Sequence, residues 1–260
     1  MRSRLAAWNR ADSAGFRAML HLPHVHLPGP RMAIVDSEPA LVGSAAFRSL
    51  ATLGNWHSSQ LERIDIRQRS EDKVHCATAF AKNGPDGRRY ADGQAVYIVT
   101  NRYGRWGIQI GSVTLRPIGI GAADDTGDAE AVASATSVLE RWVRARDDAD
   151  PIAFRRLVHL PFVELVGADL VVHRSAAGLR RDVVERLSPP DRHRSQLGHI
   201  QVRERSAHKV TLETEISRLG RGGSLIACEP ALVIVTEQQG RWALQVYSSF
   251  LTSSNSDRRR

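Results

Sequence analysis

The sequence contains two copies of one pattern, and this repetition limits the possible folds more than any other feature. Three pairs of segments match in the same order: 16–25 with 154–163, 57–74 with 193–210, and 98–110 with 234–246. They are identical at six of ten, ten of eighteen and seven of thirteen positions, with offsets of 138, 136 and 136 residues. A repeat of this length predicts a duplicated domain, because the repeats of solenoids are much shorter.

The segment between the copies predicts where the domains end. Glycine, proline and aspartate cluster in RPIGIGAADDTGDAE, and no apolar period continues through it. We therefore expect a first domain at 1–115, a linker at 116–130 and a second domain at 131–252. The polar end of the chain, 253–260, is predicted to be a disordered tail.

Each copy begins with two predicted helices. The first is short in copy one, 5–9, and long in copy two, 131–147, which indicates that residues upstream of copy one are missing or that its start is misassigned. Asp12 and Asp150 are suited to cap the second helix of each copy. The proline that follows this helix, Pro23 or Pro161, is expected to end it. This interpretation places His21 at the end of a helix.

The rest of each copy reads as two short extended pieces, a helical stretch (38–53 or 175–187) and four long strands. Ile64 and Ile66 alternate with charged residues, which predicts one dry and one wet face. The last two strands are apolar on both sides, so each of their faces needs cover. NRYGR and EQQGR are the predicted turns between them, each with a glycine for positive φ.

Composition excludes several classes of protein. A hydrophobic fraction of 42% over 260 residues supports a globular protein, and neither a signal peptide nor an apolar run of about 18 residues occurs, so we expect a cytoplasmic protein. The net charge of +8 comes from scattered arginines without a basic stripe, which argues against nucleic acid as a partner. Cys76 and Cys228 occupy unmatched positions, which predicts neither a disulfide nor a zinc site.

The order of elements resembles the nuclear transport factor 2-like (NTF2-like) α+β fold, in particular its SnoaL-like branch. The resemblance lies in AAWNRAD with FRAMLHLPHV and in VYIVTNRYGRWGIQI, and again in ADPIAFRRLVHLPFV and LVIVTEQQGRWALQV. It implies two fused cone-shaped α+β barrel domains, each with N-terminal helices packed into a curved antiparallel sheet. The outer sheet face in such folds often packs on a second subunit, so the tandem is expected to be an intramolecular pseudo-dimer, with further oligomerisation possible.

The resemblance also implies a blind, apolar pocket inside each cone, but the fold does not assign chemistry. Its relatives include a ketosteroid isomerase, a scytalone dehydratase and proteins without catalysis. Our first hypothesis is a protein that binds a small, largely apolar molecule. The alternatives are an acid–base enzyme (isomerase, dehydratase or cyclase) and a protein-assembly module, so the sequence leaves open whether the chain is an enzyme.

Histidines are the candidates for chemistry. His21, His24 and His26 could in principle hold a metal ion, but copy two keeps only His159, and no acidic or cysteine ligand adjoins them. We therefore expect no metal and take His24 and His26 to be exposed strand residues. His57, or else His21, could move a proton, because imidazole titrates near neutrality.

The remaining candidates are ligand-binding residues. His57 and His193 both precede a long strand in an H-x-S-Q context, which suits either a pocket residue or one that ties down a turn. Gln109 and Gln245 lie among apolar neighbours and need a partner, in the ligand or in the protein. Trp8 and Tyr97 could line a pocket in copy one, where Tyr97 or Gln109 could also steady an oxyanion. His159 joins this set as the twin of His21. No glycine-rich phosphate loop follows a strand, so we expect no cofactor.

Overall fold

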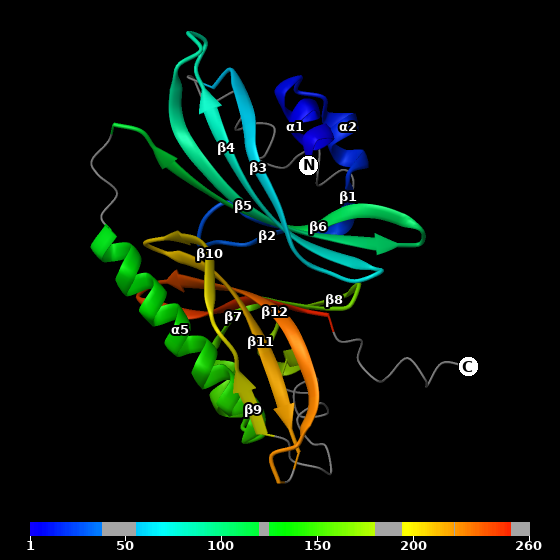
Figure 1. The fold of residues 1–260 in the computed structure, drawn as a ribbon, viewed down its shortest axis with the longest axis vertical. Helices are drawn as coiled ribbons and strands as arrows, with labels where there is room; N and C mark the ends of the chain where they lie inside the picture. The colour runs from blue at the N-terminus through cyan, green and yellow to red at the C-terminus, as the bar shows by residue number, and fades with distance from the viewer. Residues whose placement is uncertain (38–55, 120–124, 180–193, 221, 251–260) are drawn as a thin grey trace. The chain divides into compact units, whose positions relative to one another are not determined.

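The computed structural model describes residues 1–37, 56–119, 125–179, 194–220 and 222–250. The chain divides into two compact units, which we call unit 1 (Met1–Asp125) and unit 2 (Thr126–Arg260). Each unit combines N-terminal helices with one curved sheet (Figure 1). The duplication and the α+β class predicted from the sequence are confirmed.

Unit 1 has two helices and a six-stranded sheet. The elements are α1 Arg2–Asn9, α2 Ser13–Ala18, β1 Leu20–Leu27, β2 Ala33–Val35, β3 Ser58–Arg69, β4 Lys73–Asn83, β5 Arg89–Arg102 and β6 Arg105–Pro117. The strand order is β2-β1-β6-β5-β4-β3. The long strands β3 to β6 are antiparallel, as expected, but β1 runs parallel to β6, so the sheet is mixed rather than antiparallel.

Unit 2 repeats this arrangement. Its elements are α5 Asp125–Asp147, α6 Pro151–Arg156, β7 Val158–Val166, β8 Asp169–His173, β9 Arg194–Leu197, β10 Gln201–Ser206, β11 Lys209–Leu219, β12 Leu225–Gln238 and β13 Arg241–Ser249. The strand order is β10-β11-β12-β13-β7-β8, with β9 also paired to β11 and β7 parallel to β13. Both sheets remain open at their edges.

The predicted linker, helical stretches and tail fall at or near the ends of the described ranges. Strand β6 ends at Pro117 and α5 begins at Asp125, both inside the range predicted as a linker. The helical stretch at 38–53 and the tail at 253–260 lie outside the described residues. Residues 176–179, at the start of the second helical stretch, are helical.

Local sequence signals set the helix starts and the turns. The Asp12 carboxylate accepts a hydrogen bond from the Gly15 amide at 2.8 Å, and Asp150 accepts two at the start of α6, so both act as the predicted caps. In the turns that join the last two strands, Gly104 and Gly240 have φ of 75° and 78°. These are values that glycine adopts without steric cost, as expected.

The prediction that proline ends the second helix is wrong. Helix α2 ends at Ala18, and Pro23 lies within β1, at a register shift between Leu20 and Val25. A proline is tolerated there because the irregular pairing does not require its missing N–H group. His21 is therefore a strand residue rather than a helix-end residue.

The predicted dry face of β3 is also wrong, since Ile64 is 37% exposed and Ile66 is 62% exposed. Two register shifts interrupt the pairing of β3 with β4, and they break the simple alternation of faces. In unit 2, Ile200 is the counterpart of Ile64, and it packs against a core to which α5 contributes.

The difference in helix length decides how each cone is filled. Helix α5 has 23 residues and buries a full face against its sheet, whereas α1 has eight residues and buries only Ala7. Figure 1 shows α5 running along the sheet of unit 2 and the short α1 and α2 beside that of unit 1. In unit 1, the short α1 leaves a largely apolar space between the helices and the sheet. Within the described ranges, no helix is both long enough and apolar enough to cross a membrane.

Candidate functional site

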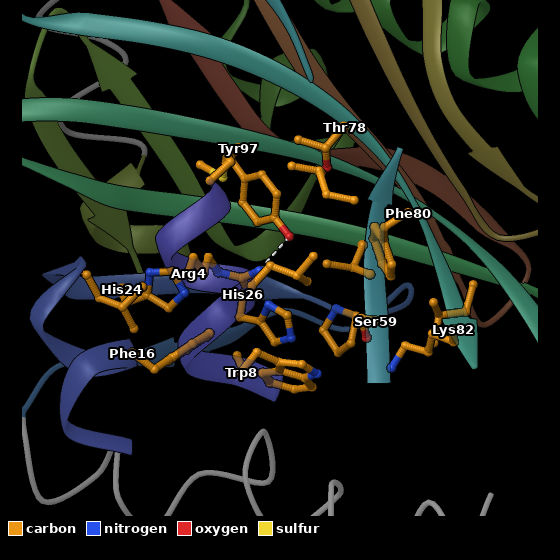
Figure 2. Close-up of a pocket in the computed structure, with 18 of the residues that line it drawn as sticks. Arg4, Trp8, Phe16, His24, His26, Ser59, Thr78, Phe80, Lys82 and Tyr97 are labelled. Carbon is orange, nitrogen blue, oxygen red and sulfur yellow. Dashed lines mark hydrogen bonds between the residues drawn. The ribbon is translucent and has the colours of Figure 1, made fainter. Parts of the chain in front are cut away.

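A cavity of about 420 Å³ lies inside the cone of unit 1 (Figure 2). Its volume falls in the range of small-molecule sites. The residues that line it are Met1, Arg4, Leu5, Trp8, Phe16, Leu20, His24, His26, Pro28, Ala33, Val35, Ser59, Leu61, Thr78, Phe80, Lys82, Tyr97, Val113 and Leu115. Most of these side chains are apolar, and the few polar ones come from α1, β1, β3, β4 and β5. Trp8 and Tyr97, two of the predicted ligand-binding residues, are both in this wall.

Arg4 is held against aromatic rings in the wall. Its guanidinium donates a hydrogen bond to the Tyr97 hydroxyl at 2.8 Å and lies 4.6 Å from the centroid of that ring and 4.7 Å from that of Phe16. The Arg4 Nε atom is buried and has no hydrogen-bond partner among the described residues. An unpaired donor of this kind can receive a polar group of a ligand.

Lys82 projects from β4 and is 6% exposed. Its ammonium lies 5.7 Å from the centroid of the Trp8 ring, and burial lowers the pKa of Lys82. No carboxylate of the described residues forms an ion pair with it. Neither Lys82 nor Arg4 was predicted to be a site residue, because neither belongs to a recognisable motif.

His24 and His26 line the pocket from β1, with ring centroids 6.4 Å apart. His24 is buried, so the prediction that both histidines are exposed is wrong. Burial, followed by the charges of His26 and Arg4, lowers the pKa of His24 to about 3. The neutral ring is oriented by a hydrogen bond between Nδ1 and the Ile108 carbonyl, at 3.2 Å. A histidine with this pKa is a weak base at neutral pH.

The described residues of the pocket wall carry positive charge and no acidic side chain. Arg4 and Lys82 are its two basic side chains beside the two histidines, and no aspartate or glutamate is among the described residues that line it. An apolar pocket with unpaired donors favours ligands that bring their own acceptors.

His21 and His159 have the same structural role in the two units. In unit 1, the ring Nε2 of His21 lies 3.1 Å from the carbonyl oxygens of Thr100 and Arg105, and Nδ1 lies 2.9 Å from the Arg105 guanidinium. His159 makes the matching contacts in unit 2. Because two carbonyls can only accept, Nε2 carries the proton and Nδ1 accepts from arginine. Burial and the charge of Arg105 lower the pKa of His21. Neither ring lines the pocket.

The other predicted site residues lie away from the cavity. His57 is exposed at the start of β3, and His193 lies outside the described residues. Gln109 is buried, donates to the Pro23 carbonyl and accepts from the Thr100 hydroxyl, so its partners belong to the protein. Gln245 repeats this with Thr236. In the part of the chain that the structure describes, no three histidine, cysteine or acidic side chains are grouped to hold a metal ion.

Unit 2 fills its cone with the same kinds of side chains taken from different positions. Trp142 and Tyr247 are fully buried with ring centroids 4.8 Å apart, and the Arg146 guanidinium lies 4.7 Å from the Trp142 ring. At the offset of 138, Trp142 corresponds to Arg4 and Arg146 to Trp8, so the two side chains have exchanged places on the helix. At fixed offsets, Trp8 and Tyr97 correspond to Arg146 and Val233, so this second aromatic pair cannot be found by aligning the two copies.

Two carboxylates complete the cone of unit 2. Glu229 accepts hydrogen bonds from the Tyr247 hydroxyl at 2.5 Å and from Arg218 at 2.8 Å, and Glu164 lies 2.8 Å from His173. Burial raises the pKa of Glu229, but the Ser249 and Tyr247 hydroxyls and the charges of Arg146 and Arg218 outweigh burial, so the pKa of Glu229 lies below its usual value. Burial also raises the pKa of Tyr247 to about 12, so its hydroxyl remains a donor.

Similarity to known proteins is limited to solved structures. No protein-family model matches the chain, and no curated protein matches its sequence. Three similar solved structures are an NTF2-like protein of unknown function from Pseudomonas putida (11% identity, TM-score 0.42), a hexachlorocyclohexane dehydrochlorinase from Novosphingobium barchaimii (14%, 0.41) and a protein of unknown function with a cystatin-like fold from Nostoc punctiforme (12%, 0.41). They cover 52%, 50% and 47% of this chain and 94%, 92% and 92% of their own chains. Each match thus has the length of about one unit.

Proposed function

We propose that the first of the two NTF2-like domains in this chain binds a small, largely apolar molecule inside its cone. The cavity of about 420 Å³ is the observation that carries this proposal. Its aromatic and aliphatic wall would gain free energy by covering apolar ligand surface, at roughly 25 cal/mol for each Å² removed from water.

Binding without catalysis fits the placement of the histidines better than acid–base chemistry does. An enzyme needs a base within hydrogen-bond reach of the ligand, and His57 is exposed outside the cavity while His21 uses both ring nitrogens within the protein. His24 does line the cavity, but its pKa of about 3 makes it a weak base.

The assembly alternative rests on a different observation. Ile66 and Leu225 are 62% and 63% exposed, and large exposed apolar side chains often mark contact surfaces. The pseudo-dimer and any further oligomer stay predictions, as does the cytoplasmic location.

Isothermal titration calorimetry with 1-naphthaleneacetamide, a neutral bicyclic probe, tests the proposal. The probe is expected to bind with one site per chain and a negative heat-capacity change, because apolar surface is buried. Val113→Trp, which places an indole in the cavity wall, should abolish this binding. Trp106→Phe, at a residue that is 46% exposed and outside the cavity, should leave it unchanged.

Absence of binding, or equal binding by Val113→Trp, would refute the pocket as a binding site. Native mass spectrometry of the protein purified from its own host would then show which molecule it retains.

A further inference from the structure

We propose that the pocket of unit 1 is selective for an anionic ligand, one with an apolar body and a carboxylate that pairs with Lys82. This inference rests on the function proposed above and names the chemical class of the ligand. It follows from a comparison of the two cones, in which one contains a carboxylate and the other contains a cavity.

The cone of unit 2 shows how a carboxylate is held in this fold. Glu229 projects from β12 and accepts hydrogen bonds from Tyr247 at 2.5 Å and from Arg218, on the neighbouring β11, at 2.8 Å. Glu229 is 2% exposed, so its charge depends on the Ser249 and Tyr247 hydroxyls and on the charges of Arg146 and Arg218. The positive and negative charges inside this cone are therefore balanced by the protein itself.

The cone of unit 1 keeps the cation and lacks the acid. Lys82 stands at the position of Arg218, and Gly93 stands at that of Glu229. The strand registers agree with this correspondence, since Lys82 pairs with Ala91 as Arg218 pairs with Ala227. The missing carboxylate is therefore a difference in side chain and not a shift in alignment.

The side chain of Phe80 helps to define the position that a ligand would take. A Cβ atom added at Gly93 would lie 2.2 Å from the Phe80 ring, so the ring covers the place from which a glutamate would project. Phe80 thus forms an apolar wall next to Lys82, and both line the cavity. This arrangement offers an ammonium group beside a surface for an apolar body.

Energetics favour an external counter-ion. A buried ammonium without a carboxylate partner is costly, and burial lowers the pKa of Lys82 with no charged group of the described residues to offset it. A ligand carboxylate would restore the ion pair that Arg218 and Glu229 make in unit 2. Figure 2 shows Arg4 on a different part of the wall, where its buried Nε is a donor for a second polar group of the ligand.

Calorimetric titration of the whole chain with 1-naphthaleneacetate and 1-naphthaleneacetamide tests the inference, because the two probes have the same shape and differ in charge. The wild type is expected to bind 1-naphthaleneacetate at least about tenfold more tightly than 1-naphthaleneacetamide, because only the carboxylate forms a charge-assisted hydrogen bond with the buried ammonium. Lys82→Met should reduce this ratio to less than about threefold, and Lys82→Arg should preserve it.

A second variant transfers the arrangement of unit 2 into unit 1. Phe80→Ile with Gly93→Glu gives unit 1 the residue types of positions 216 and 229, with the carboxylate on the strand paired to that of Lys82, and should remove the preference for 1-naphthaleneacetate. Circular dichroism confirms that each variant is folded. Lys82→Met is expected to raise the melting temperature and to weaken the binding of 1-naphthaleneacetate. General damage to the fold would not produce this combination.

The outcomes separate the two proposals. Equal affinities of the wild type for both probes would overturn the inference and leave the pocket intact. If Lys82→Met keeps the wild-type preference for 1-naphthaleneacetate, the inference is also overturned. Binding of neither probe would refute the proposed function, and the inference with it.

Discussion

Replacing Trp142 by alanine should open in unit 2 a cavity like the one that unit 1 already has. Trp142 is fully buried between α5 and the sheet, and its ring lies 4.8 Å from Tyr247 and 5.6 Å from Phe154. The proposed ligand site requires this contrast between the two cones, because a ligand can enter only a cone that is not already filled by side chains.

The expected cost of Trp142→Ala follows from these contacts. A buried tryptophan removes about 200 Å² from water, which at roughly 25 cal/mol per Å² stabilises the fold by about 5 kcal/mol. The indole N–H has no hydrogen-bond partner among the described residues, and its removal relieves about 1 kcal/mol. We therefore expect unit 2 to lose about 4 kcal/mol, within the usual range of about 3–5 kcal/mol for this substitution.

Trp8→Ala is the matched control in unit 1. Trp8 is half-buried and borders an existing cavity, so its loss should cost only about 1–2 kcal/mol. Urea unfolding would measure both values, and hydrogen–deuterium exchange would assign them to a unit. Peptides from β12 should lose protection in Trp142→Ala, while those from β5 should not. Millimolar indole should restore part of the lost protection by filling the new space.

A cost below about 1 kcal/mol for Trp142→Ala, or an equal cost for Trp8→Ala, would contradict the reasoning. Either result would mean that the cone of unit 2 is not filled more tightly than that of unit 1. Failure of indole to restore protection, despite a large loss of stability, would mean that the cone collapses instead of opening.

Three further predictions concern buried titratable groups. Glu229→Gln should destabilise unit 2 by about 1–3 kcal/mol at pH 7, because the buried Arg146 loses a counter-charge and the partly exposed Arg218 adds less. Since the folded pKa of Glu229 is lowered, its contribution is present above the unfolded pKa of about 4.3, and in urea titrations the difference from wild type should shrink as the pH falls below that value. His24→Phe should make unit 1 less sensitive to acid between pH 6.5 and about 3. In the wild type, His24 is protonated in the unfolded chain over this range but stays neutral in the folded unit, so the free energy of unfolding falls with pH. Thermal melts over this range would show whether the variant loses less stability than the wild type. His21→Ala and His159→Ala should each cost about 1–3 kcal/mol in urea titrations, and His21→Ala should leave the dissociation constant of 1-naphthaleneacetamide within about twofold.

The features that the sequence predicted well are local ones. Asp12 and Asp150 cap helices because a carboxylate two or three residues ahead of free amides binds them in any fold. Gly104 and Gly240 mark turns because of their own backbone freedom. The predictions for Pro23 and Ile66 failed because strand pairing with register shifts, which leaves no local signal, places Pro23 inside a strand and exposes Ile66.

The candidate site was only partly predictable for a similar reason. Trp8 and Tyr97 were identified as pocket residues, but Arg4 and Lys82 look like ordinary basic residues in the sequence. Their importance depends on burial without a carboxylate partner, which is a property of the surroundings. The one available signal was Glu229, whose counterpart is a glycine.

By itself, the sequence determined that this chain is one α+β domain twice over, because repeated residues, apolar alternation and capping side chains act over a few positions of the backbone. Only the tertiary structure decided that the two copies differ in their interiors. A long α5 packs Trp142 into one cone, and a short α1 leaves the other hollow around Lys82. The physical reason is that a cavity is defined by what side chains from distant strands and helices fail to fill, and no single segment records that.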